Sequence, residues 1–118
     1  MKYIIAGGRD FNNYSVVCKV LSQFNNITEI VSGDARGADT QGIMYGNQYH
    51  IPVKHFPAKW DEYGKSAGFI RNAEMADYAD IAICFWDEKS KGTTHMIKTM
   101  DLKRKPCYVF DYQGNKIL

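Results

Sequence analysis

Four glycine-containing segments of the sequence carry side chains that suit a bound phosphate. Two of them join glycines to arginine, in the runs 7–10 (Gly-Gly-Arg-Asp) and 32–39 (Ser-Gly-Asp-Ala-Arg-Gly-Ala-Asp). Adjacent glycines let backbone N–H groups approach a ligand closely, and an arginine adds a forked set of charged donors. A third segment, 60–72, contains aromatic residues and an Arg-Asn pair, and a fourth, 86–95, contains Gly92 followed by threonines. These residue types predict a site for an anionic ligand such as a nucleotide.

Each segment also has a purely structural interpretation. Gly7 and Gly8 can form a tight turn in which Arg9 pairs with Asp10. Segment 60–72 can be a surface loop, and segment 86–95 a capped helix start after a charged loop. Both interpretations stay open at the level of the sequence.

Individual side chains in these segments have candidate roles. Asp39 in a first helical turn can complement the helix dipole, accept hydrogen bonds from ribose hydroxyls, or orient Arg36. Trp60 and Tyr63 can stack on a base. The candidate ligand-binding residues are Gly7, Gly8, Arg9, Asp10, Ser32, Gly33, Arg36, Gly37, Asp39, Trp60, Arg71, Asn72, Trp86, Ser90, Gly92 and Thr93.

Alternating apolar runs and helical spacings predict the elements that position these residues. The predicted strands are 2–6, 28–32, 52–56, 80–85 and 107–110, and the predicted helices are 13–24, 38–49, 66–78 and 92–104. The pattern is typical of an α/β fold, here a Rossmann-like doubly wound domain of about five parallel strands with helices on both faces. Ligands bind such sheets at the carboxyl ends of the strands, and each of the four segments follows one of the first four strands.

Two of the predicted helices have unusual sequences. Gly42 and Gly46 lie four residues apart on one helix face. Because glycine weakens a helix by about 1 kcal/mol, we expect this face to pack closely against a neighbour. In the helix 66–78, helical spacing predicts an apolar side made of Phe69, Ile70, Ala73 and Ala76.

The overall composition excludes several classes of protein. The 118 residues suit one domain spanning 1–118, and a formal net charge of +2 is too small for a protein that coats DNA, so no nucleic-acid partner is expected. The three cysteines are widely spaced and are not grouped with histidine, so no metal site is expected. The N-terminal apolar run is too short for a signal peptide or a membrane span, which predicts a cytoplasmic protein with no membrane partner.

Taken together, four motifs resemble a known family. They are Gly7-Gly8-Arg9-Asp10, Ser32-Gly33-x-Ala35-Arg36-Gly37-Ala38-Asp39, Tyr63-Gly64-x-x-Ala67-Gly68-x-x-Arg71-Asn72-x-x-Met75 and Phe85-Trp86-x-x-x-Ser90-x-Gly92-Thr93. The chain is similar to the small YspA and YpsA-related proteins of the SLOG superfamily, and more distantly to the LOG and Smf/DprA proteins that give the superfamily its name. The resemblance implies a Rossmann-like fold that binds nucleotides or molecules derived from them.

One branch that the sequence resembles, the LOG phosphoribohydrolases, releases a base from nucleoside monophosphates. Its motif Pro-Arg-Lys-x-x-Met aligns with residues 71–75, with Asn72 in place of the lysine. Its motif Pro-Gly-Gly-x-Gly-Thr-x-x-Glu aligns at Gly92 and Thr93, and Met96 then stands where that branch has glutamate. A methionine cannot stabilise the oxocarbenium-like transition state of this reaction, so LOG-type hydrolysis is not expected.

The leading hypothesis is a binding domain for a nucleotide or a derivative such as ADP-ribose, NAD or a cyclic nucleotide signal, with no separate cofactor. It would act as a sensor or as a sequestering protein of a phage or mobile element. The alternative is an N-glycosidase or phosphoribohydrolase-like enzyme acting on such nucleotides, with Asp39 or Glu74 as its candidate catalytic carboxylate. A third hypothesis, a nucleic-acid protein, depends on the distant similarity to DprA alone.

The aromatic residues and the resemblance together predict a homo-oligomer, either a dimer or a tetramer. Proteins of this superfamily often pair through helices beside the ligand site. Trp60, Tyr63 and Tyr78 lie in or near one segment and suit an interface that walls a pocket. Alternatively, these aromatic residues fold back onto their own sheet.

Overall fold

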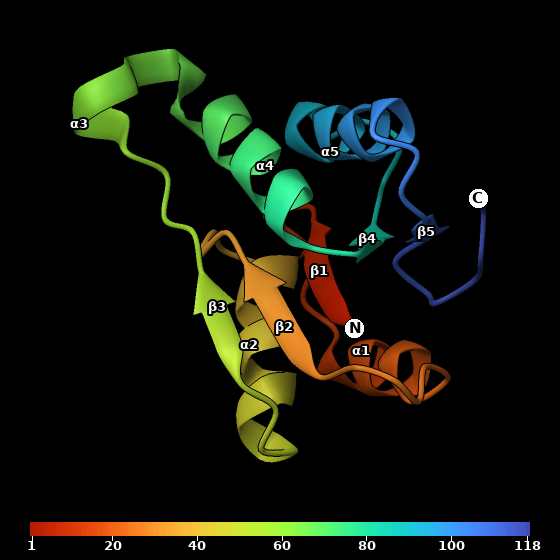
Figure 1. The fold of residues 1–118 in the computed structure, drawn as a ribbon. Helices are drawn as coiled ribbons and strands as arrows, with labels where there is room; N and C mark the ends of the chain where they lie inside the picture. The colour runs from red at the N-terminus through yellow and green to blue at the C-terminus, as the bar shows by residue number, and fades with distance from the viewer.

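The computed structural model describes residues 1–118 and contains five parallel strands in the order β3-β2-β1-β4-β5 (Figure 1). The order reverses between β1 and β4, and the predicted doubly wound α/β fold is thereby confirmed. In chain order the elements are β1 Lys2–Gly7, α1 Tyr14–Leu21, β2 Glu29–Ser32, α2 Ala38–Gln48, β3 Val53–His55, α3 Trp60–Tyr63, a 3-10 turn Gly64–Ser66, α4 Ala67–Tyr78, β4 Ile81–Phe85, α5 Lys91–Leu102 and β5 Cys107–Phe110.

Helices cover both faces of the sheet, and alternate residues of each strand face opposite helical layers. In β1, Tyr3 and Ile5 pack with α1 and α2, whereas Ile4 and Ala6 pack with α4 and α5. Figure 1 shows these two pairs of helices on opposite sides of the sheet. Every residue of β4 is buried, as expected for a strand covered on both faces.

The two glycines of α2 bring this helix close to the sheet. A Cβ atom at Gly42 would lie 2.7 Å from the Cβ of Ile5, and one at Gly46 would lie 2.7 Å from a methyl carbon of Val53. Any larger residue would push α2 away from β1 and β3. The close packing predicted for this face is confirmed.

Two predicted boundaries are wrong. The helix predicted over 13–24 ends at Leu21, because Ser22 and Gln23 begin a polar turn, and the Phe24 ring packs edge-on against Tyr3 instead of extending the helix. Between the predicted strand 52–56 and the predicted helix 66–78, where the sequence predicts no regular element, the structure contains α3 and the 3-10 turn, and Gly64 with φ 58° ends α3. None of the helices is long and apolar enough to cross a membrane.

The buried face of α4 also differs from the prediction. Phe69 is 48% exposed, and Ile70 and Ala73 are only partly buried. Arg71 and Asn72 are buried instead, together with Ala67, Met75 and Ala76. The polar pair makes hydrogen bonds to the loop after β2 and to the first turn of α5, and these bonds determine how the helix is rotated about its axis.

Candidate ligand-binding site

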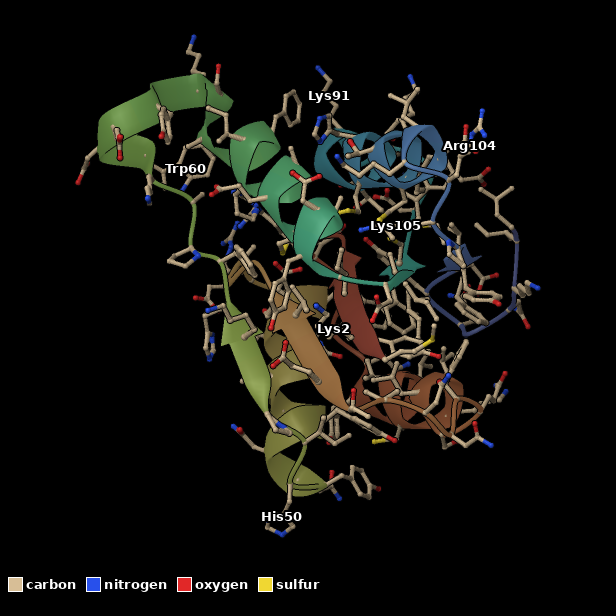
Figure 2. All side chains as sticks on the ribbon, viewed as in Figure 1. Lys2, His50, Trp60, Lys91, Arg104 and Lys105 are labelled. Carbon is tan, nitrogen blue, oxygen red and sulfur yellow. The ribbon has the colours of Figure 1, made fainter.

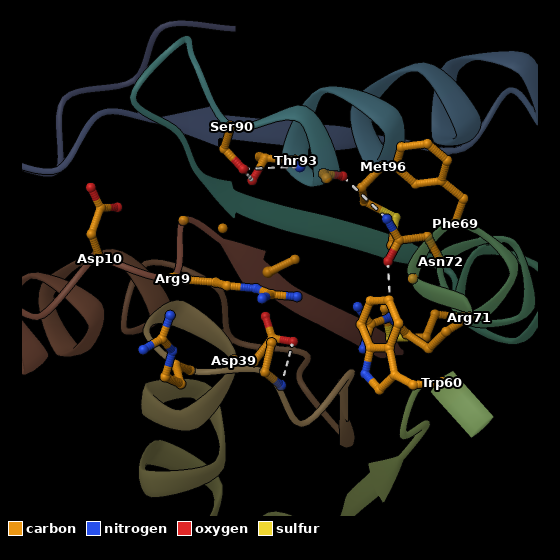
Figure 3. Close-up of a pocket in the computed structure, with 18 of the residues that line it drawn as sticks. Arg9, Asp10, Asp39, Trp60, Phe69, Arg71, Asn72, Ser90, Thr93 and Met96 are labelled. Atoms are coloured by element: carbon orange, nitrogen blue, oxygen red, sulfur yellow. Dashed lines mark hydrogen bonds between the residues drawn. The ribbon is translucent and has the colours of Figure 1, made fainter. Parts of the chain in front are cut away.

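A cavity of about 550 Å³ lies at the carboxyl ends of the strands, where the strand order reverses. Parallel open sheets bind ligands at this place, and ligand pockets commonly have volumes of about 300–1,000 Å³. Figure 3 shows side chains from several segments converging on it. Its lining residues are Ala6, Gly7, Gly8, Arg9, Asp10, Ala35, Arg36, Asp39, Trp60, Lys65, Gly68, Phe69, Arg71, Asn72, Met75, Ser90, Gly92, Thr93 and Met96.

The loops after β1 and β2 pack directly on each other. The carbonyl oxygen of Gly8 accepts hydrogen bonds from the N–H groups of Phe11, at 3.3 Å, and Ala38, at 3.2 Å. Gly37 has φ 77°, and a Cβ atom there would lie 2.3 Å from the same carbonyl oxygen. Gly37 therefore serves the contact between the two loops rather than a direct contact with a ligand.

Arg9 and Arg36 are exposed cations that form no ion pair with an acidic side chain. Figure 3 shows the Arg9 side chain extending into the middle of the cavity. Asp10 does not pair with Arg9, because its carboxylate accepts a hydrogen bond from the Tyr112 hydroxyl at 2.6 Å. The structural interpretation of this loop as an Arg9–Asp10 pair is therefore wrong, and both guanidinium groups are free to meet a ligand.

Arg71 is a buried arginine that joins α4 to the loop after β2. Its Nη1 donates to the Gly33 carbonyl oxygen, and its Nε donates to Oδ1 of Asn72 at 3.1 Å. A Cβ atom at Gly33 would lie 2.6 Å from Nη1, so only glycine leaves room for this contact. Burial lowers the pKa of Arg71, and the nearby Asp39 carboxylate partly opposes this effect. Arg71 thus both lines the cavity and holds its wall in place.

Asp39 is a buried acid at the start of α2. One carboxylate oxygen accepts a hydrogen bond from the N–H of Ala35 at 3.2 Å. Burial raises the pKa of Asp39 to about 6, even though the charge of Arg71 and the backbone N–H groups act in the opposite direction. No hydrogen bond or ion pair joins Arg36 to Asp39, whereas the charge of Arg71 acts on the Asp39 carboxylate.

Asn72 connects α4 to the beginning of α5. Its side-chain amide donates to the Gly92 carbonyl oxygen at 3.1 Å. Ser90 is the N-cap of α5, and its hydroxyl accepts a hydrogen bond from the Thr93 N–H at 3.3 Å. The interpretation of this segment as a capped helix is therefore correct, and the same residues also line the cavity.

The cavity has an apolar part beside its cationic part. The buried side chains of Met75 and Met96 come from α4 and α5. Phe69 stacks on His95 with ring centroids 4.4 Å apart. Trp60 is half exposed and lies over Gly68, where a Cβ atom would be 3.5 Å from the indole ring. Figure 2 shows Trp60 on the side of the α3 segment that faces α4.

Comparison with known proteins identifies the family of this chain. The model of the YspA, cpYpsA-related SLOG family matches residues 1–63. The chain belongs to this family. The resemblance predicted from the motifs is confirmed. The Gene 61 protein of Mycobacterium phage D29 is 32% identical over 75 residues, which cover 58% of this chain and 60% of that protein. The chain thus matches less than two thirds of the length of this relative.

The SLOG family match covers one part of the cavity. Residues 1–63 include both glycine-rich loops, with Arg9, Arg36 and Asp39, and extend through α3. The residues that α4 and α5 contribute, among them Arg71 and Thr93, lie beyond the matched range. The cavity of this SLOG protein is therefore completed by the half of the chain outside the family match.

Some candidate residues lie away from the cavity. Glu74 is exposed on α4 and is not a lining residue. Trp86 packs against the core between the sheet and α4–α5, and its indole N–H is buried without a hydrogen-bond partner. Ser32 is buried, and its hydroxyl donates to the Asp39 carbonyl oxygen at 3.3 Å. Gly33 lines only a smaller neighbouring cavity.

The sequence reasoning also missed several lining residues. Met75 ends the third motif and Met96 follows the fourth, and each lies three or four residues from a predicted site residue on its helix. This spacing places them on the same helix face as Arg71 and Thr93. The other lining residues that the sequence did not predict are Ala6, Ala35, Lys65, Gly68 and Phe69.

No group of three or more His, Cys, Asp or Glu side chains is placed to hold a metal ion.

Proposed function

We propose that this SLOG protein binds a nucleotide or a nucleotide-derived small molecule in the 550 Å³ cavity. The observation that carries the proposal is the cavity's division into a cationic part and an apolar part. Arg9 and Arg36 have charges that no acidic side chain neutralises, and Met75 and Met96 supply apolar surface. A nucleotide has two corresponding parts, because its phosphate suits arginine and its flat base suits an apolar wall.

Thermal unfolding and calorimetric titration with AMP, ADP, ADP-ribose, NAD and cyclic dinucleotides test this proposal. A ligand present at a hundred times its Kd should raise the free energy of unfolding by about 2.7 kcal/mol. Gly92→Val is the blocking variant. A Cβ atom at Gly92 meets no atom within 4 Å, so the variant should fold, while its larger side chain narrows the cavity at α5. No stabilisation by any of these ligands, or equal stabilisation of Gly92→Val, would contradict the proposal.

The proposed biological role is that of a sensor or a sequestering protein in the cytoplasm. The similarity to a mycobacteriophage protein supports a phage or mobile-element context. The three cysteines are free, which fits a reducing compartment. Stopped-flow measurement of ligand release separates the two roles, because sequestration requires slow release whereas a sensor must release its ligand as the concentration falls.

A second candidate function is cleavage of the N-glycosidic bond of the bound nucleotide, and the position of Asp39 supports it. Its carboxyl group lines the cavity and, with a pKa of about 6, can exchange a proton near neutral pH. Incubation with nucleotides should then release free base. Asp39→Asn should abolish this release while binding persists, whereas Glu74→Gln, which changes a carboxylate outside the cavity, should have no effect. Absence of base release from the wild-type protein would exclude this function.

We further propose that the chain forms a homo-oligomer through the segment that contains α3. Trp60 and Tyr63 are 50% and 40% exposed there, and Phe69 lies nearby on α4. Tyr78 does not belong to this surface, because it packs back onto Phe56 and its hydroxyl donates to Glu29. Light scattering tests the proposal, and a mass of 13.5 kDa at micromolar concentration would contradict it.

A further inference from the structure

A second, smaller cavity adjoins the first on the side of β3. Its volume is about 280 Å³, below the size of about 300 Å³ at which independent ligand pockets begin. The two cavities share five lining residues, which are Arg9, Ala35, Arg36, Trp60 and Arg71. The smaller cavity is therefore best described as an extension of the larger one.

The three shared arginines lie where a ligand would pass from one cavity to the other. Arg9 and Arg36 have no acidic partner, and Arg71 uses Nη1 and Nε in hydrogen bonds to the protein. Several positive charges at one place match two linked phosphates better than one. A mononucleotide placed in the larger cavity would leave the smaller cavity empty.

The smaller cavity, but not the larger one, is lined by a carboxylate with one unused oxygen, that of Asp34. Asp34 has φ 62°, and its N–H donates to the Ser32 hydroxyl at 3.2 Å, which holds the turn after β2. Its Oδ1 lies 2.6 Å from Nδ1 of His55 on β3, and its Oδ2 has no protein donor. A carboxylate oxygen held in this way is an acceptor for sugar hydroxyls and repels a free terminal phosphate.

We propose that the ligand is a nucleoside diphosphate joined to a second sugar. The base occupies the apolar part of the larger cavity, the diphosphate lies on Arg9, Arg36 and Arg71, and the second sugar fills the smaller cavity. There Asp34 accepts hydrogen bonds from the sugar hydroxyls. This inference depends on the proposed function, since it specifies the ligand of the same site.

Calorimetric titration of matched ligand pairs tests the inference. The pairs are ADP with ADP-ribose, UDP with UDP-glucose and GDP with GDP-mannose, which differ only in the second sugar. The variant is Asp34→Gly, because glycine adopts the backbone conformation of Asp34 without strain. The matched control is Glu88→Gly, which removes an exposed carboxylate from another residue of positive φ, at 66°, outside both cavities.

At least one sugar-bearing ligand should bind the wild-type protein about ten- to hundredfold more tightly than its nucleoside diphosphate, as hydrogen bonds to a charged group allow. Asp34→Gly should erase this difference without weakening the diphosphate, and Glu88→Gly should preserve it. If the diphosphates bind but no sugar adds affinity, or if Asp34→Gly weakens both members of a pair equally, the inference is wrong and the proposed function stands. If no nucleotide binds, both fail.

Discussion

The polar side chains that line the cavity form two groups, which differ in whether they have partners within the protein. In the first group, which we call the hydrogen-bonded side, each residue has a protein partner; its members are Arg71, Asn72, Ser90 and Thr93. Arg71 and Asn72 donate to backbone oxygens of the loop after β2 and of α5, whereas Ser90 and Thr93 bond to each other at the start of α5. The second group, which we call the free side, is exposed and lacks acidic partners; it consists of Arg9 and Arg36 in the loops after β1 and β2, and Lys65 in the turn before α4.

This difference separates the residues that hold the cavity in shape from those that are free to bind a ligand. A side chain that is buried and bonded to the backbone contributes to folding as well as to binding, so its removal affects both. An exposed cation that has no acidic partner contributes little to stability, because its removal breaks no interaction within the protein. The two sides should therefore respond differently to the same substitution.

Arg71→Ala should have the largest effect. It removes the hydrogen bonds to Gly33 and Asn72 and leaves Asp39 without its nearby cation. We expect the free energy of unfolding to fall by about 2–4 kcal/mol and nucleotide affinity to fall more than hundredfold. Chemical denaturation combined with calorimetry measures both quantities, and an unchanged unfolding midpoint would place Arg71 on the free side.

Asp39 should make stability depend on pH. Its pKa is raised from 3.8 to about 6 in the folded protein, so the folded state favours the protonated carboxyl group. The stability from this group is complete below pH 3.8 and is lost as the pH rises through about 6, a loss of about 3 kcal/mol at most. Urea denaturation of the wild type and Asp39→Asn across pH 4–8 should show the two free energies diverging over this range. Parallel curves would contradict the prediction.

Arg36→Ala should separate binding from stability. We expect nucleotide affinity to fall about ten- to hundredfold, because an arginine–phosphate contact contributes about 1.5–3 kcal/mol. The free energy of unfolding should change by less than about 0.5 kcal/mol, since the side chain is exposed. The matched control is Arg104→Ala, which removes the same charge at the far end of α5 (Figure 2). Equal affinities of the two variants would remove Arg36 from the site.

Lys65→Ala should have the smallest effect. Lys65 is exposed in the 3-10 turn, and its flexible side chain has no acidic partner. An exposed ammonium group contributes about 0.5 kcal/mol to a charge contact, which corresponds to an affinity loss of about twofold. Titration at low and high salt checks this, because the effect should disappear at high ionic strength. A tenfold loss that persists in salt would mean that Lys65 closes onto the ligand.

The parts of the fold that could be predicted depend on local signals. Apolar runs mark β1 and β4, and the glycines of the loops after β1 and β2 mark places where two backbones touch, as Gly37 and Gly8 do. Each of these features depends on residues that are adjacent in the sequence, so the sequence alone predicts it. The cavity could be placed for the same reason, because the carboxyl end of each strand follows directly from the strand prediction.

The rotation of α4 could not be predicted from hydrophobicity. The apolar residue Phe69 faces the cavity mouth, whereas Arg71 and Asn72 face the interior. Their partners are the carbonyl oxygens of Gly33 and Gly92, which are far away in the sequence. For the same reason the sequence could not show that Glu74, three residues after Arg71, is exposed to solvent, or that the partly buried Trp86 side chain packs against the core.

Identification of the molecule that the protein retains tests the central claim most directly. The wild type, Arg36→Ala and Arg104→Ala are saturated with deproteinised cell extract, desalted and denatured, and the released small molecules are analysed by mass spectrometry. The wild type and Arg104→Ala should release the same phosphate-bearing, base-containing compound in near-stoichiometric amount, and Arg36→Ala should release at least about tenfold less. A wild-type protein that releases no such compound, or equal release from all three proteins, would contradict the account.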